Sequence, residues 1–203
     1  MKFVLRLTSV ALAGAMVCVG PVASAALPSA PSPARSSISS SASTEQVVTI
    51  TVETYDTAHH LVSTEVLGAA DGAGVDESGS GGTPSASGCQ KVTVNNYTRS
   101  LIFHTIILGY HTWTYWCWNR ASYSVNSVST NYYISHLDPT IDWVGEAARD
   151  LRYYAWLAGH SSSGYWHYRM GHFQQCYPWT CANLYPSNTL RSHSDGTWTW
   201  ATT

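Results

Sequence analysis

Short runs of residues that favour β-strands follow one another from Gln90 to Thr202, and turn residues separate them. The runs are rich in Val, Thr, Tyr and Trp, and apart from residues 138–154 none keeps a helical period. We expect strands over 90–97, 100–108, 112–118, 122–128, 131–135, 152–157, 165–173, 184–193 and 197–202. So many short strands predict an all-β domain, an antiparallel β-sandwich of the immunoglobulin-like or jelly-roll-like kind.

The apolar residues of this chain are mainly aromatic residues with a polar edge. Nine Trp and 13 Tyr stand against three Phe, and such rings suit strands and partly wet surfaces. Only 11% of the residues are charged. An ordinary soluble domain has roughly 25%. The chain is too polar for a membrane protein and carries too few charges for a disordered one.

The N-terminus has the three parts of a secretory signal peptide. Lys2 and Arg6 form the charged region, Leu7 to Val19 the apolar region, and Ala23-Ser24-Ala25 the cleavage site. The apolar run is too short for a membrane span, which needs roughly 20 residues. We therefore expect residues 1–25 to be removed and the mature chain to be secreted, extracellular and without a membrane span.

Two segments before the β-rich domain lack residues that could build a core. Residues 26–44 are almost only Ala, Ser and Pro, and residues 68–88 are rich in Gly and Ser, so both are predicted to be linkers in a disordered N-terminal region. Residues 45–67 predict an acidic β-hairpin, which either pairs with the main domain or acts as a spacer or pro-segment. The main domain is predicted over residues 89–203.

The cysteines of the mature chain predict a disulfide-stapled domain. Of five cysteines, Cys18 leaves with the signal peptide, and an even number in an exported chain favours disulfides. Three pairings are possible, and we expect Cys89 with Cys117 and Cys176 with Cys181. A four-thiolate zinc site is the alternative, but it usually uses paired C-x2-C knuckles, which are absent from the sequence.

Residues 138–154 fit two structures. Asp138-Pro139 is a suitable helix start, and apolar residues follow it at helical spacing. Gly145 interrupts that stripe, and Ile141 to Val144 also fits a strand that ends at Gly145. We favour a strand followed by a turn over the helix.

No metal site or complete catalytic motif is predicted. The pairs His104/His111 and His167/His172 are each separated by an odd number of residues, which puts their members on opposite faces of a strand. Seven histidines lie in the domain, and their full protonation would raise its formal charge from plus 2 to plus 9. Anionic partners should therefore bind better in acid.

Two weaker signals keep an enzyme open as an alternative. Residues 159–164 resemble the nucleophile elbow G-x-S-x-G, but Ser163 stands where the second glycine belongs, and a loop between two strands is the simpler interpretation. Four of the domain's five carboxylates, Asp138, Asp142, Glu146 and Asp150, stack along one face of a helix but disperse on a strand and turn. We nominate no catalytic residue, no metal ligand and no cofactor.

Several motifs of the domain together carry a resemblance. They are Tyr115-Trp116-Cys117-Trp118, Trp143-Val144-Gly145, Arg169-Met170-Gly171-His172-Phe173-Gln174-Gln175-Cys176, Cys181, Tyr185-Pro186 and Asp195-Gly196-Thr197. The combination resembles a group of small secreted β-rich proteins of high-GC Gram-positive bacteria and covers the C-terminal domain. The resemblance implies export, disulfides and a β-rich fold, and it supplies no catalytic residue.

Rows of aromatic residues are the strongest indication of a ligand-binding function in the sequence. If Cys117 is buried with its disulfide, strand alternation turns Trp113 and Tyr115 inward with it and leaves Trp116 and Trp118 on the opposite face. Rigid rings on an open face stack against sugars or apolar peptides, although burial in the core is the alternative. Similar pairs lie on the last strand and on the tip of the small disulfide ring. The expected ligand-binding residues are Trp116, Trp118, Trp198, Trp200, Trp179 and Tyr177.

These observations predict a secreted, non-catalytic binding module that recognises glycan or another cell-envelope polymer through exposed aromatic rows. An exported hydrolase that uses histidines and loop carboxylates is the alternative, and a secreted protein-binding effector is a second one. The domain's seven Lys or Arg exceed its five Asp or Glu by only two. It therefore lacks the dense basic stripe of a nucleic-acid-binding protein.

Overall fold

The computed structural model describes residues 44–56, 58–68 and 77–203, and every regular element in these ranges is a β-strand. The strands are β1 (Thr44–Tyr55), β2 (Leu61–Gly68), β3 (Glu77–Gly81), β4 (Ser87–Ser100), β5 (Ile106–Asn119), β6 (Ser124–Ser135), β7 (Ile141–Tyr154), β8 (Gly164–Tyr177), β9 (Thr180–Leu184), β10 (Ser187–His193) and β11 (Trp198–Thr202). The all-β prediction is confirmed. The predicted signal peptide and nearly all of the 26–44 linker lie outside the described residues.

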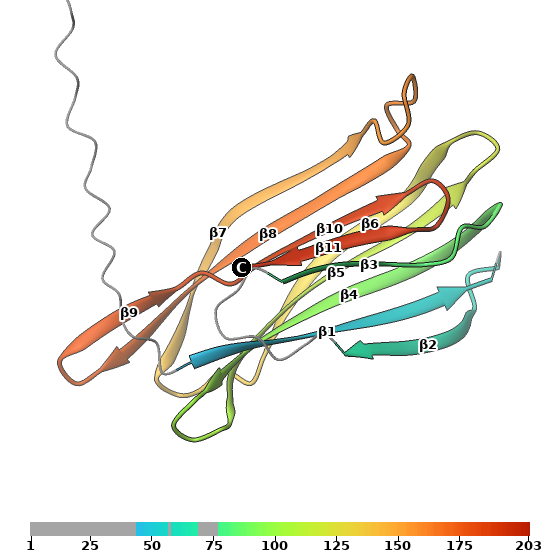
Figure 1. Ribbon diagram of the computed structural model, residues 1–203. Coiled ribbons are helices and arrows are strands. Elements are labelled where there is room, and N and C mark those ends of the chain that lie inside the picture. The colour runs from blue at the N-terminus through green and yellow to red at the C-terminus, as the bar shows by residue number, and fades with distance from the viewer. Residues whose placement is uncertain (1–43, 57, 69–76) are drawn as a thin grey trace, which may run out of the picture. The chain divides into compact units, whose positions relative to one another are not determined.

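The strands form two antiparallel sheets that pack face to face (Figure 1). Sheet A has the order β2-β1-β4-β5-β6, and sheet B has the order β3-β11-β10-β8-β7, with β9 paired to β8. Most neighbours in each sheet are consecutive hairpin strands, as expected for a chain with short turns. The predicted antiparallel β-sandwich is therefore observed.

The acidic hairpin of β1 and β2 is part of sheet A. β1 pairs with β4 along its whole length, from Thr44 opposite Ser100 to Tyr55 opposite Cys89. Val48 and Ile50 of β1 are 0% and 2% exposed in the core, so the hairpin contributes to the sandwich rather than trailing from it. In the predicted 68–88 linker, β3 pairs with β11 and β4 begins.

The interior has two apolar clusters with a polar layer between them. The larger cluster joins both sheets and includes Val92 and Trp116 of sheet A with Leu190 and Trp198 of sheet B. The smaller one contains Leu108, Tyr110 and Phe173, among others. In the polar layer, Asn188 of β10 donates to the carbonyl oxygens of Val94 and Tyr110 and accepts a hydrogen bond from Asn96, so these buried amides join the two sheets.

The strand predicted over 100–108 is wrong in its first half. Residues 101–105 form the turn between β4 and β5, and Leu101, Ile102 and Phe103 are 40%, 67% and 74% exposed. The apolar run predicted a buried strand, but the hydrogen bond from the His104 amide to the Ser100 carbonyl closes a tight turn, in which His104 has a φ of 54°. The runs predicted over 122–128 and 131–135 merge into β6.

Residues 141–154 form one continuous strand, so the turn predicted at Gly145 is wrong. β7 pairs with β8 from Ile141 to Tyr154, and two bulges interrupt the register, one between Trp143 and Gly145 and one after Glu146. Gly145 has a φ of 151°, which lets the first bulge form without ending the strand. A bulge breaks the alternation of side chains, and this explains why the segment resembles a helix in sequence.

Both predicted disulfides are confirmed, and each joins residues that lie directly opposite each other on neighbouring strands. Cys89 of β4 faces Cys117 of β5, and Cys176 of β8 faces Cys181 of β9. Within the described residues there is no helix long and apolar enough to cross a membrane.

The two disulfides should differ in their effect on stability. The first closes a separation of 28 residues and the second one of only 5. In the chain-entropy description these loops correspond to about 3.6 and about 2 kcal/mol of unfolding free energy. We expect urea unfolding to show the larger loss for the double variant Cys89→Ser/Cys117→Ser, with Cys176→Ser/Cys181→Ser as its matched comparison. A larger loss for the second pair would contradict this order.

Candidate functional site

Four of the six tryptophan and tyrosine residues expected to bind ligand lie in the core. Trp116 is 0%, Trp198 1%, and Trp118 and Trp200 each 8% exposed. All four belong to the larger apolar cluster between the sheets. The expectation that these rings face solvent is therefore wrong.

The reason is the position of the Cys89–Cys117 disulfide. Side chains do alternate along β5, but the disulfide lies on the outer face of sheet A rather than in the core, so the two sets of side chains exchange places. Trp116 and Trp118 point inward, whereas Trp113 and Tyr115 lie with Cys117 on the outer face and are partly exposed.

Trp118 and Trp198 also line a hollow of about 390 Å³ at one edge of the core, together with Val52 and Leu67 of the hairpin. Their rings are held there by packing, and the Trp118 Nε1 donates a hydrogen bond to the Ser85 hydroxyl. The hollow gives a ligand little ring surface to contact, because both indoles remain almost completely buried.

The other two expected residues are exposed. Tyr177 and Trp179, at the tip of the β8–β9 hairpin, are 56% and 94% exposed. The Cys176–Cys181 disulfide closes this hairpin directly beneath them. Tyr177 and Trp179 are therefore two exposed aromatic side chains on a disulfide-closed tip and do not belong to a row across a sheet face.

The outer face of sheet A carries a row of aromatic side chains, which we call the aromatic face: Tyr55, Tyr115, Trp113, Tyr133 and Tyr97. They come from β1, β4, β5 and β6, and all are at least partly exposed. Alternation along the central strands points them away from sheet B. Among the described residues, no strand covers this face.

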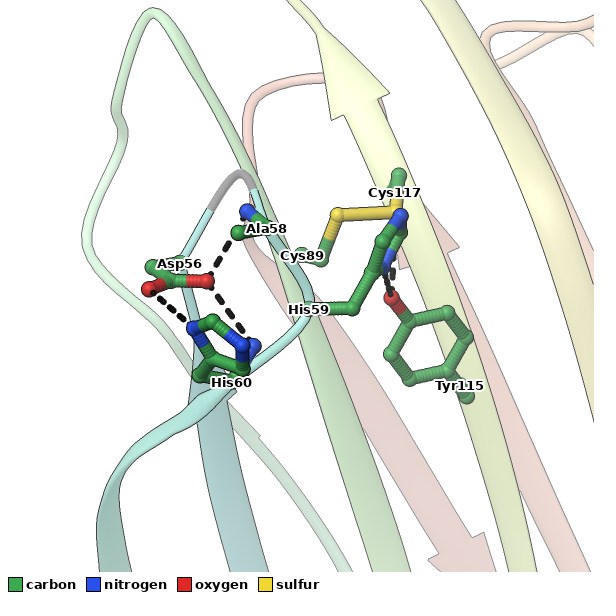
Figure 2. The surroundings of a disulfide bond; sticks show 7 residues. All are labelled: Asp56, Ala58, His59, His60, Cys89, Tyr115 and Cys117. Carbon is green, nitrogen blue, oxygen red and sulfur yellow. Dashed lines mark hydrogen bonds and ion pairs between the residues drawn. A yellow bond between two sulfur atoms is a disulfide. The ribbon is translucent and has the colours of Figure 1, made fainter.

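One end of the aromatic face covers the Cys89–Cys117 disulfide (Figure 2). The Nδ1 of His59, in the β1–β2 loop, lies 2.5 Å from the Tyr115 hydroxyl, and that hydroxyl lies 3.4 Å from Cys117 Sγ. The Tyr55 and Tyr115 rings meet edge to face, 5.4 Å apart. This cover explains why both sulfur-bearing residues are buried on an outer face.

The loop that carries His59 is held by Asp56. Its Oδ1 accepts hydrogen bonds from the amides of Ala58 and His60, and its Oδ2 lies 3.3 Å from His60 Nδ1 (Figure 2). A ring nitrogen of His59 and the sulfur atoms of Cys89 and Cys117 lie within 4.8 Å of one another. The disulfide removes the thiolates that a soft metal ion would need, so the oxidised protein offers no such site here.

A charged pair lies in the middle of the aromatic face. Lys91 Nζ is 2.8 Å from Glu53 Oε2 and 5.5 Å from the centre of the Trp113 ring. Burial alone would raise the pKa of Glu53, but hydrogen bonds from Lys91 and Tyr55 outweigh it and lower the pKa. Burial, reinforced by the bond to Glu53, raises the pKa of Tyr55 to about 12. The Glu53 carboxylate and the Lys91 ammonium group are therefore held in place beside the Tyr55 and Trp113 rings.

A polar chain of three residues lies at the other end of the aromatic face. Asn95 Oδ1 is 2.8 Å from His111 Nδ1, and His111 Nε2 is 2.6 Å from the hydroxyl of Ser135. The Tyr133 ring stacks on the imidazole at 4.3 Å with an interplanar angle of 7°, and the Tyr97 ring contacts it edge-on at 5.1 Å. His111 is thus fixed on every side.

The expectation that all seven domain histidines gain charge in acid is wrong for three of them. Burial, with a smaller effect of His136, lowers the pKa of His111 to about 4. Burial and then Arg169 lower the pKa of His167 to about 3. Burial lowers that of His193 to about 4, with opposing effects of Asp195 and Arg191. Mild acid therefore leaves these three buried histidines largely uncharged.

The other catalytic signals in the sequence have structural roles. Ser163 is 0% exposed. Its hydroxyl accepts hydrogen bonds from the amides of Trp156 and Leu157 and donates one to the carbonyl oxygen of His160, so it holds a loop together. The carboxylates of residues 138–150 are dispersed rather than stacked, and Glu146 pairs with the buried Arg169. Neither set resembles an active site.

Sequence reasoning missed the Asn95–His111–Ser135 chain. Gly109, His111, Trp113, Tyr115 and Cys117 share one face of β5, and that alternation is readable in the sequence. The partners on β4 and β6 are not, because they depend on the register between strands that are distant in sequence.

Comparisons with known proteins add no family to this description. A scan against protein-family models, a search of curated proteins and a search of solved structures each found no match.

Proposed function

We propose that the protein is a secreted binding module and that its aromatic face binds glycan, such as a cell-envelope polysaccharide. The observation that carries the proposal is the row of aromatic rings on an outer sheet face, with the Glu53–Lys91 pair between them. Sugar rings present C–H faces that stack on aromatic rings and hydroxyl groups that bond polar side chains. A sheet face that supplies both kinds of contact suits an extended polysaccharide.

Export is part of the same proposal. It rests on the predicted signal peptide over residues 1–25, on the resemblance to small secreted β-rich proteins, and on the two disulfides, which persist in oxidising compartments.

Replacing Trp113 by Ala should weaken glycan binding by roughly 30-fold, as for a central aromatic contact worth about 2 kcal/mol. Tyr133→Ala should weaken it as well, because Tyr133 is 47% exposed on the same face. A glycan array followed by titration of the best ligand measures both effects. Tyr153→Ala is the matched control, since Tyr153 is 49% exposed on β7 of the other sheet.

Protein binding is a second candidate, favoured by Trp179 alone. A side chain 94% exposed on a disulfide-closed tip suits insertion into a pocket of a partner. If Trp179→Ala abolishes glycan binding while Trp113→Ala leaves it unchanged, the aromatic face is not the glycan site. Absence of binding to any glycan by the folded protein would also refute the first proposal.

A further inference from the structure

We propose that Ser135, His111 and Asn95 form a nucleophilic site that accepts acyl groups from carboxylic esters. The order of groups is that of a nucleophile, a base and a residue that orients the base. The two distances in the chain, 2.6 Å from Ser135 to His111 and 2.8 Å from His111 to Asn95, are both hydrogen-bond distances. This inference does not depend on glycan binding.

The partners of Asn95 fix which nitrogen of His111 is free. The Asn95 Nδ2 donates to the hydroxyls of Thr49 and Thr51, at 3.3 and 3.1 Å, so its Oδ1 faces the imidazole. An amide oxygen only accepts, and His111 Nδ1 must therefore carry the proton. The lone pair of Nε2 then points to the Ser135 hydroxyl, which donates to it. This is the tautomer that a general base requires.

The surroundings keep His111 neutral and oriented. It is 2% exposed, and Tyr133 and Tyr97 pack against its ring. Burial lowers its pKa to about 4, so the base is uncharged at neutral pH. A base with so low a pKa takes up a proton weakly, and we expect reaction with esters that have good leaving groups rather than with amides.

Gly109 makes the contact between Ser135 and His111 possible. A Cβ at this position would lie 2.8 Å from His111 Nε2 and closer still to the Ser135 hydroxyl. Ser135 is the last residue of β6 and is partly exposed, so a substrate can approach it from the outer face. His136, in the left-handed region with a φ of 52°, lies with Nδ1 2.9 Å from the same hydroxyl.

The reaction needs only an ester and water. The Ser135 oxygen forms a bond to the carbonyl carbon while its proton passes to His111 Nε2, and the bond to the leaving alcohol breaks as the alcohol takes that proton. Water then attacks the acyl-serine, with His111 again accepting a proton and returning it to the Ser135 oxygen. The products are one carboxylic acid and one alcohol.

A fluorophosphonate probe tests the site directly, because a reactive serine oxygen displaces fluoride from phosphorus and keeps the phosphonyl group. We expect peptide mass spectrometry of the folded protein, with both disulfides formed, to find the adduct at Ser135. The Ser135→Ala variant should lose it, and His111→Gln should slow its formation about 100-fold or more. Ser129→Ala is the control, since Ser129 is an exposed serine of the same strand. p-Nitrophenyl acetate turnover should follow the same order.

A variant at Asn95 separates a positioning role from simple packing. Asn95→Asp keeps an acceptor facing Nδ1 and should retain labelling, whereas Asn95→Leu should lose it. Failure to label Ser135 in the folded protein, or equal labelling rates with and without His111, would overturn the proposal. The proposal would also be overturned if His136→Gln lost labelling while His111→Gln kept it, because His136 and not His111 would then act as the base. The probe carries no sugar, so these results are independent of glycan binding.

Discussion

Lowering the pH from 7 to 5 should destabilise the folded protein by about 6 kcal/mol. Three buried histidines are responsible: His111, His167 and His193, whose pKa values in the fold are lowered to about 4, 3 and 4. In the unfolded chain each has a pKa near 6.5. Below that value the unfolded state binds protons that the folded state does not, so stability falls with pH.

The size of the effect follows from how far pH 5 lies below the ordinary pKa of histidine. The difference is about 1.5 pH units, so each of the three histidines contributes about 2 kcal/mol to the loss of stability. The loss begins near pH 6.5 and levels off once the pH falls below the lowered pKa values. Because total stabilities of domains are about 5–15 kcal/mol, a change of this size removes a large part of the fold's stability.

Urea unfolding at pH 7, 6 and 5 measures the effect. The variant His167→Gln should show about two thirds of the pH dependence, since two of the three groups remain. His160→Gln is the matched control, because His160 is exposed. This variant should keep the full pH dependence of the unfolding free energy. Stability that does not change between pH 7 and 5 would contradict the burial of these side chains.

Replacing Trp116 by Ala should cost about 3–5 kcal/mol of unfolding free energy. Its ring is 0% exposed and belongs to the cluster that joins the two sheets, next to Trp118 at 6.2 Å between ring centres. Truncation removes the buried ring and leaves a cavity that the flanking strands cannot close.

Chemical denaturation compares Trp116→Ala with Trp179→Ala. Trp179 is 94% exposed, so its removal should change stability by less than about 0.5 kcal/mol. Equal losses in both variants, or a negligible loss for Trp116→Ala, would mean that Trp116 does not lie in the core.

The fold class and both disulfides could be predicted because they depend on local patterns and on the number of cysteines. The face of each strand could not, since alternation separates two faces without saying which one is buried. A buried Cys117 disulfide predicts that Cys117 faces the core, but here a loop residue, His59, and Tyr115 bury it on the outer face. The wrong face for Cys117 led to the prediction that Trp113 is buried and Trp116 exposed, whereas in the structure Trp116 is buried and Trp113 is partly exposed.

The candidate site depends on the register between strands, which cannot be read directly from the sequence. Asn95, His111 and Ser135 come together through the register of β4, β5 and β6, and the Ser135 position opposite Gly109 is fixed only when the strands pair. The turn at residues 101–105 shows the opposite case, in which apolar residues favoured a strand but local hydrogen bonds close a turn. The resemblance to small secreted β-rich proteins stays a prediction.

Hydroxyl-radical footprinting, with and without a polysaccharide that the protein retains, tests the central claim most directly. The free protein should be oxidised at Trp113, Tyr133 and Trp179 and protected at Trp116 and Trp198, in line with their exposure. Bound polysaccharide should then protect Trp113 and Tyr133 and leave Trp179 reactive. Oxidation of Trp116 in the folded protein, or protection by polysaccharide at Trp179 alone, would contradict the assignment of the aromatic face as the binding surface.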